Sequence, residues 1–305
     1  MSVSSDDCTK APSTFEVARV LLVTPPLVKP AEPGLPAAAA AEALRARGVD
    51  ATSLDASLDW FWYAMSSERL EGHLAALAES SSTGRGVSPG VLLACKRAAR
   101  NLASSPPDLR RAVTYEDKQR YTSAVRHVVN ALKLASSPYE GVQLRVGDVG
   151  IEGRRPASSE HLEAFASAPG PFDDYFAEQL IPRIASSGVT HVGLSLTFYH
   201  QAWACFRLAR MLEERIPGVR RLLGGPLIAC WRAVGQDLAS PLFSNFDEVL
   251  AEGSDDELDG LAERLGGHRT SLDAPRIVDL AEADWGRYLV PSPTVPLAVG
   301  RGCYY

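Results

Sequence analysis

Short apolar runs, separated by stretches in which apolar residues recur every three or four positions, mark both ends of this chain. Near the start, the run 17–23 predicts a strand that ends at Thr24-Pro25-Pro26, because proline has no N–H to donate to a sheet. The alanine-rich stretch 37–47 precedes Gly48 and predicts a helix, since glycine tolerates the left-handed conformation that often follows one. Residues 50–54 predict a second strand.

The same alternation returns at residue 172. The expected elements are a helix at 175–187, a strand at 191–196, a helix at 201–215, a strand at 221–223, a short helix through Trp231 and Leu238, a strand at 248–251 and a helix at 255–265. Short strands that alternate with helices indicate an α/β protein with a doubly wound parallel sheet of the flavodoxin-like, or Rossmann-like, kind.

A long segment, residues 56–171, interrupts this alternation, and we call it the insertion. It opens on the aromatic cluster Trp60–Tyr63, which indicates core packing more than a ligand site. The insertion is expected to be mainly helical, because helical periodicity is found at 67–78, 91–102 and 115–134. One strand is expected from the alternation of Val142, Leu144 and Val146. The chain then divides into a disordered lead-in at 1–16, a two-part α/β domain at 17–55 and 172–267, the insertion at 56–171, a linker at 268–293 and a final segment at 294–305.

The composition favours a cytoplasmic protein over a membrane, secreted or nucleic-acid-binding one. No apolar run approaches the roughly 18 residues that a spanning helix needs, and residues 1–13 lack the apolar core of a signal peptide. The five cysteines are scattered, which suits a reducing compartment, and Cys95, Cys205 and Cys230 lie in apolar company as expected of inert core thiols. The net charge is −6 and no stripe of Lys and Arg is present, which argues against nucleic acid as the partner.

Candidate binding residues lie where the expected strands end. In a doubly wound sheet, ligands bind outside the carboxyl ends of the strands, where the strand order reverses. Those ends carry small, polar or Gly- and Pro-rich residues, namely Thr24, Pro25, Pro26, Ser195, Leu196, Thr197, Gly224, Gly225, Pro226, Glu252, Gly253 and Ser254. Glycines let a ligand approach the backbone, and hydroxyls donate and accept hydrogen bonds. Neither GxGxxG nor GxxxxGK[ST] is present, so neither a dinucleotide nor a P-loop nucleotide is indicated.

The order and spacing of several short motifs resemble the cobalamin-binding domain that precedes many radical S-adenosylmethionine enzymes. The motifs are Val20–Pro26, Gly34-Leu35-Pro36, Leu54-Asp55, Val192–Ser195, Phe198, Gln201, Leu223–Pro226 and Glu252-Gly253. The resemblance covers residues 17–55 and 172–305 and adds Leu35 and Phe198 to the candidate residues. It implies a bound cobalamin at the carboxyl ends of the strands. Among the cobalamin-dependent group, members that mature ribosomally made peptides share the pattern at Asp284–Tyr305.

The last residues, Arg301-Gly302-Cys303-Tyr304-Tyr305, resemble the start of the radical S-adenosylmethionine motif CxxxCxxC. The resemblance implies that Cys303 is a ligand of a four-iron four-sulfur cluster that binds S-adenosylmethionine. It also implies that residues 294–299 form the first strand of a barrel. Because the sequence stops two residues after Cys303, we expect it to be the front part of a larger enzyme, with cluster and S-adenosylmethionine bound only by the full-length protein.

Two departures modify what the resemblance implies. The Asp-x-His-x-x-Gly motif that places an imidazole on cobalt is absent, so histidine-free cobalamin binding is expected. The usual Gly-Glu-Gly-Glu is Ala251-Glu252-Gly253-Ser254 here. The full-length protein is therefore expected to be a methyltransferase or an enzyme that modifies a peptide or small-molecule substrate. Two alternatives remain: a non-catalytic cobalamin or nucleotide carrier, and an interaction module with a flavodoxin-like fold that binds no ligand.

Overall fold

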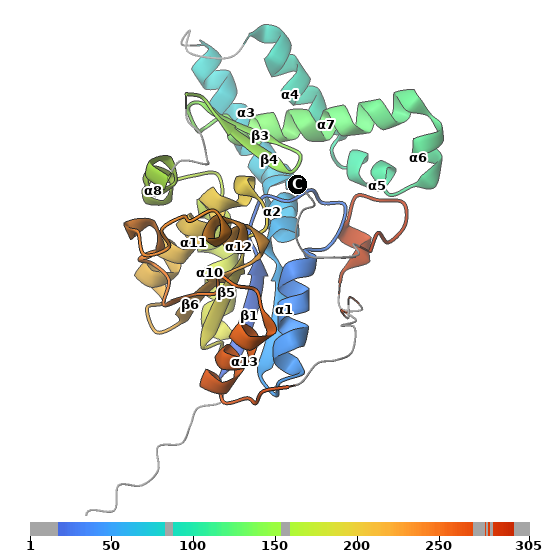
Figure 1. The fold of residues 1–305 in the computed structure, drawn as a ribbon. Coiled ribbons are helices and arrows are strands. Elements are labelled where there is room, and N and C mark those ends of the chain that lie inside the picture. The colour runs from blue at the N-terminus through green and yellow to red at the C-terminus, as the bar shows by residue number, and fades with distance from the viewer. Residues whose placement is uncertain are drawn as a thin grey trace, which may run out of the picture.

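A five-stranded parallel sheet forms the centre of the protein (Figure 1). The computed structural model describes residues 18–82, 88–153, 159–270, 278, 280 and 283–295. The strand order is β2-β1-β5-β6-β7, with β1 (Arg19–Thr24), β2 (Asp50–Asp55), β5 (His191–Ser195), β6 (Arg220–Gly224) and β7 (Glu248–Val249). All four strand pairs are parallel. The predicted α/β class with a parallel sheet is confirmed, and the strand order reverses between β1 and β5.

Helices cover both faces of the sheet. One face packs against α1 (Leu35–Arg45) and α13 (Asp255–Arg264) through Val20 and Leu22 of β1, both buried. On the other face lie α9 (Asp173–Tyr175), η1 (Phe176–Leu180), α10 (Ile181–Ser186), α11 (Ala202–Arg215) and α12 (Pro226–Ala233). Val23 of β1 packs on this second face, because successive side chains of a strand point to opposite faces.

Several predicted elements differ in their bounds. The helix predicted at 37–47 is α1 and begins at Leu35, since Pro36 lies in its first turn, where the missing N–H costs no bond. The helix predicted at 175–187 is interrupted by η1, a π-helical turn. The helix predicted through Leu238 ends at Ala233, before Gly235 with φ +78°. Thr294 and Val295 form no strand, and the rest of the predicted barrel strand lies outside the described residues.

The insertion is built mainly from helices, as its periodicity predicts. They are α2 (Ala56–Ala64), α3 (Ser67–Ser82), α4 (Pro89–Asn101), α5 (Ser105–Leu109), α6 (Ala112–Glu116), α7 (Lys118–Ser136) and α8 (Ser159–Ser167). An antiparallel hairpin of β3 (Val142–Arg145) and β4 (Asp148–Ile151) follows α7. The hairpin and the long α7 lie above the end of the sheet at which the strands finish (Figure 1).

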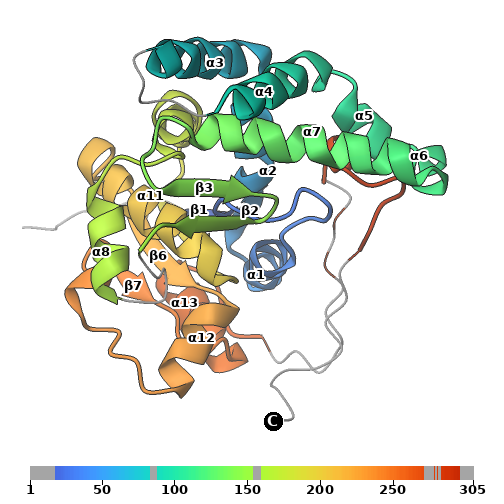
Figure 2. The same ribbon diagram turned by 90° about the horizontal axis from the view of Figure 1, so that it is seen from above.

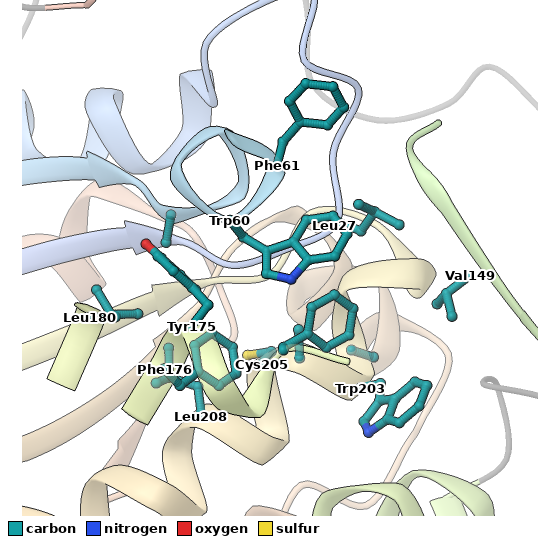
Figure 3. Packing of buried hydrophobic residues seen from close by; sticks show 14 of the residues in the cluster. Leu27, Trp60, Phe61, Val149, Tyr175, Phe176, Leu180, Trp203, Cys205 and Leu208 are labelled. Carbon is teal, nitrogen blue, oxygen red and sulfur yellow. The ribbon is translucent and has the colours of Figure 1, made fainter. Parts of the chain in front are cut away.

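The insertion and the sheet share one hydrophobic core. Trp60 of α2 is fully buried, with its ring edge-on to Phe172 at a centroid distance of 5.2 Å. Trp203 of α11 also packs edge-on against Phe172, with ring centroids 5.8 Å apart, and Val149 of the hairpin lies close to Trp203 (Figure 3). Since aromatic side chains bury the largest apolar areas, this cluster fixes the insertion to the sheet.

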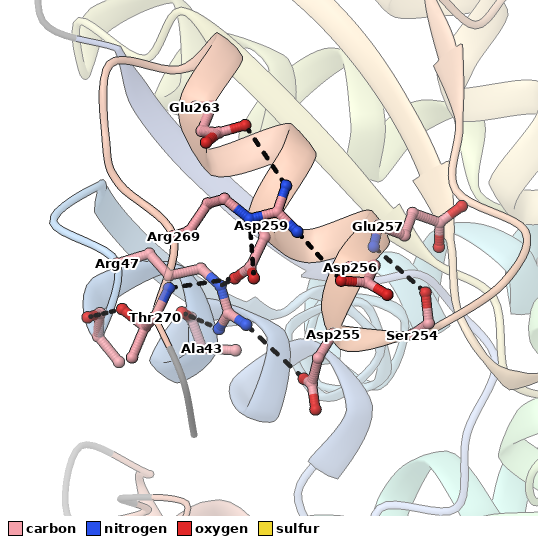
Figure 4. Close-up of polar contacts among 11 residues, drawn as sticks. Ala43, Arg47, Ser254, Asp255, Asp256, Glu257, Asp259, Glu263, Arg269 and Thr270 are labelled. Carbon is pink, nitrogen blue, oxygen red and sulfur yellow. Dashed lines mark hydrogen bonds and ion pairs between the residues drawn. The ribbon is translucent and has the colours of Figure 1, made fainter. Parts of the chain in front are cut away.

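A second buried cluster joins α1 to α13 (Figure 4). The Arg47 side chain is completely buried, with Nε 2.5 Å from Asp259 and a nitrogen donating to the Ala43 carbonyl at 2.9 Å. The hydrogen bond from Arg47 holds the pKa of Asp259 below its usual value. The remaining guanidinium nitrogen faces the Asp255 carboxylate at 3.7 Å, so protein groups account for this arginine and we assign the cluster a structural role.

Candidate functional site

The predicted binding residues lie along one edge of the sheet, which we call the carboxyl edge. Thr24, Ser195 and Gly224 are the last residues of β1, β5 and β6. The other predicted residues occupy the following turns and helix starts: Pro25 and Pro26 after β1, Leu35 as the first residue of α1, Leu196, Thr197 and Phe198 after β5, Gly225 and Pro226 at the start of α12, and Glu252, Gly253 and Ser254 before α13.

Gln201 links the turn after β1 to the turn after β5. It is fully buried, and its Nε2 donates to the Pro25 carbonyl at 2.8 Å. Its Oε1 accepts from the backbone N–H groups of Thr197 and Phe198 at 3.1 and 2.9 Å. The side chain thereby uses polar backbone groups that would otherwise face a ligand. In the sequence, Gln201 stands only among the motifs that carry the resemblance. Its one local signal is a polar residue directly before a helix with a long apolar face.

Gly225 is required by protein packing. Its φ is +110°, and a Cβ placed there would lie 2.5 Å from the Leu196 carbonyl oxygen and 2.7 Å from the Leu196 nitrogen. Those two atoms are already engaged, because Leu196 N–H donates to Gly224 and Leu227 N–H donates to the Leu196 carbonyl. The space beside Gly225 that we expected a ligand to use is therefore filled by the backbone of Leu196, in the neighbouring turn after β5.

The backbone N–H groups of the turn after β7 are satisfied by a protein side chain, as Gln201 satisfies those after β5. The Glu257 carboxylate accepts from the backbone N–H groups of Ala251, Glu252 and Gly253 at distances between 2.8 and 3.1 Å. Ser254 caps α13 by accepting from the Glu257 N–H at 3.2 Å. These donors favour a negative charge, and the protein supplies its own.

The β3–β4 hairpin covers the part of the carboxyl edge next to β1 (Figure 2). Its turn residue Gly147 packs on Lys29, where an added Cβ would lie 2.5 Å from Lys29 Cγ. Leu144 and Val149 anchor the hairpin, with only 1% and 3% of their surfaces exposed. The alternation in the sequence predicts a strand here but not its location, because the contact joins residues more than a hundred positions apart.

Two aromatic rings stand exposed on the turn after β5. Phe198 and Tyr199 keep 47% and 48% of their surfaces accessible, which is unusual for aromatic residues beside a sheet. Phe198 stacks on the ring of His200, with centroids 5.2 Å apart and planes 16° from parallel. The Tyr199 hydroxyl accepts from Trp231 Nε1 at 3.3 Å, which fixes its orientation. Burial, together with the charge of Lys29, lowers the pKa of His200, and Asp148 opposes that change.

The end of β2 contacts the segment that follows the α/β domain. Asp55 caps α2 by accepting from the Leu58 N–H at 2.9 Å and accepts from the Tyr288 hydroxyl at 2.9 Å. Burial raises the pKa of Asp55, and its hydrogen bonds oppose the rise. Asp59 pairs with Arg287 at 2.5 Å. This part of the edge is therefore closed by residues 283–289.

The described residues hold no group of three or more His, Cys, Asp or Glu side chains that could bind a metal ion. The predicted iron ligand Cys303 lies outside them. Cys95 and Cys205 are buried as predicted, but Cys230 is exposed, since Leu227, Ile228 and Trp231 form the buried face of α12. None of the helices in the described ranges combines the length and apolar character needed to cross a membrane.

We expect thiol labelling to separate the described cysteines. In the native protein, iodoacetamide should modify Cys230 fastest of the three, while Cys205 stays unmodified because it is fully buried and burial raises its thiol pKa. Peptide mapping by mass spectrometry after a timed reaction gives the modified fraction at each site. Labelling in denaturant is the control and should reach all three. Equal native rates for Cys205 and Cys230 would contradict this arrangement.

Comparison with protein-family models, with curated proteins and with solved structures finds no significant match to this chain.

Proposed function

We propose that this chain is the cobalamin-binding region of a radical S-adenosylmethionine enzyme, a methyltransferase or an enzyme that modifies a peptide or another natural product. The observation that carries the proposal is the pair of half-exposed rings, Phe198 and Tyr199, beside the reversal of strand order between β1 and β5. Ligands of open parallel sheets bind at that reversal, and exposed aromatic faces suit a flat conjugated ring system. Bound cobalamin would supply a methyl carrier or a redox partner.

The β3–β4 hairpin covers the half of the carboxyl edge next to β1, so a cofactor would bind more readily to the other half. Lifting it would expose Leu144 and Val149, each contributing roughly 1.5–3 kcal/mol through burial. An opening cost of about 3–6 kcal/mol leaves fewer than about 1% of molecules open. Because only open molecules could bind a cofactor under the hairpin, the affinity there would be reduced in proportion to this small open fraction. We therefore assign the cofactor to the β5 side of the reversal, against Phe198 and Tyr199, extending along the edge toward β7, with the Thr197 hydroxyl and the Glu252 carboxylate as polar contacts.

The proposal includes cobalamin binding without a histidine ligand. His200 is the imidazole next to the aromatic pair, and its ring is stacked on Phe198. Iron and S-adenosylmethionine belong to the proposal only for a longer protein, because one thiolate, Cys303, does not hold such a cluster.

Titration of the chain with hydroxocobalamin tests the proposal. We expect about one equivalent per monomer, and the electron paramagnetic resonance spectrum of the cob(II)alamin form should lack the nitrogen splitting of a lower axial ligand. Phe198→Ala should weaken binding at least tenfold, about 1.4 kcal/mol. Tyr121→Ala is the matched control, because Tyr121 is an aromatic residue with 40% exposure on α7 in the insertion.

A third variant separates the two halves of the edge. Thr24→Val changes a buried residue at the end of β1 with little change of volume, and it should alter binding less than twofold. If Thr24→Val abolishes binding while Phe198→Ala does not, the cofactor lies under the hairpin. Nitrogen splitting that disappears in His200→Ala would contradict histidine-free binding, and absence of bound cobalamin would remove the proposal.

One observation favours a second candidate, an interaction module that binds no ligand. Gln201 and Glu257 saturate backbone donors in two turns of the edge, and the hairpin covers a third. A module of this kind would bind neither cobalamin nor nucleotides. The same titration distinguishes the two candidates.

A further inference from the structure

A groove in the insertion shares no lining residue with the proposed cofactor site. It has a volume of about 240 Å³ and opens between the end of α2, the start of α3 and the turn from α4 to α5. Buried apolar side chains form its floor, namely Met65, Leu70 and Leu102. Pockets for drug-sized ligands measure about 300–1,000 Å³, so this groove suits a smaller molecule. We call it the Trp62 groove after the indole in its wall.

The indole of Trp62 is held in place by a contact outside the groove. Its Nε1 donates to the Arg287 carbonyl at 3.1 Å, so the polar atom of the ring is satisfied. The ring face is available to the groove, because Trp62 is only half-buried. A fixed aromatic wall of this kind binds apolar groups with little loss of side-chain entropy.

Arg110 gives the groove a positive charge that no described residue neutralises. Its guanidinium carbon lies 6.0 Å from the centre of the Trp62 ring. The nearby carboxylate of Asp108 pairs with Arg120 at 2.9 Å and with Arg111 at 3.9 Å. Some of the described arginines have no carboxylate partner. Of these, Arg110 is half-buried and all the others are exposed. A guanidinium has five N–H donors whose geometry matches a carboxylate. A ligand that carries a carboxylate would therefore pair with Arg110.

We propose that the Trp62 groove binds a small carboxylate with an apolar body. The apolar body lies on Met65, Leu70 and Leu102 beside the indole, and the carboxylate binds Arg110. This site is separate from the proposed cofactor site and does not depend on it.

The probe is 4-phenylbutanoate, with 4-phenylbutan-1-ol as its uncharged counterpart. Binding is followed by the indole N–H resonance of Trp62, which Trp62→Phe identifies by its loss. For a ligand of about twelve non-hydrogen atoms we expect a Kd on the order of 1 mM. The alcohol should bind at least tenfold more weakly, because it lacks the charge that Arg110 requires.

Two neighbouring arginines provide the matched variants. Arg110→Gln should weaken 4-phenylbutanoate at least tenfold, whereas Arg111→Gln, at an exposed position one residue later, should change it less than twofold. Thermal unfolding of both variants checks that they fold. The proposal is overturned if the alcohol binds as well as the acid, if both variants lose binding equally, or if the Trp62 resonance shows no saturable shift up to about 10 mM.

Discussion

Replacing Gly225 with valine should destabilise the protein strongly even when no ligand is present. The new Cβ would meet the backbone of Leu196 at 2.5 Å, and the residue would keep a φ of +110° that side chains rarely adopt. Backbone strain costs about 1–3 kcal/mol and overpacking about 1–3 kcal/mol, so we expect the free energy of unfolding to fall by about 2–6 kcal/mol. Urea denaturation of the ligand-free variant measures this loss.

Gly235→Val is the control for strain alone. Gly235 also has positive φ, at +78°, but an added Cβ there would have no atom within 4 Å. The control should therefore lose only the strain contribution, about 1–3 kcal/mol. Equal losses in the two variants would show that the contact with Leu196 is not the cause. The result also bears on ligand binding, since reduced cobalamin binding by Gly225→Val would report an altered fold and not a filled pocket.

The sheet could be predicted because its evidence is local. The central strands β1, β5 and β6 are apolar runs that end at a hydroxyl residue or a glycine, and the helices beside them show their own periodicity. Parallel strands need crossover connections, so the alternation also predicts that Thr24, Ser195 and Gly224 reach one edge. The parallel sheet and the common edge of these three residues both agree with the structure.

The covering of that edge could not be predicted, because it rests on contacts between distant residues. Nothing near Val149 indicates that it packs close to Leu27 and Trp203, and nothing near Gln201 indicates that its amide reaches Pro25. A glycine in a turn is equally compatible with a close ligand and with close backbone. At Gly225 the structure has backbone, which the local sequence could not distinguish from the other case.

Trp60→Ala should cost about 3–5 kcal/mol, as expected for a fully buried aromatic side chain. The indole fills the space between α2 and Phe172, and its Nε1 donates to the Pro171 carbonyl at 3.1 Å. Removing it leaves a cavity and an unsatisfied acceptor at the junction of insertion and sheet. Urea denaturation followed by circular dichroism gives the loss.

Trp62→Ala is the matched comparison, because Trp62 lies on the same helix and also donates to a backbone carbonyl but is only half-buried. It should cost clearly less than Trp60→Ala.

Because the buried aromatic cluster belongs to both the insertion and the sheet, the wild-type protein should unfold in one transition by near-ultraviolet and far-ultraviolet signals. Two separate transitions would mean that the insertion folds independently and that the hairpin is held over the carboxyl edge only weakly, whereas equal losses for the two tryptophan variants would contradict the role given to the burial of Trp60.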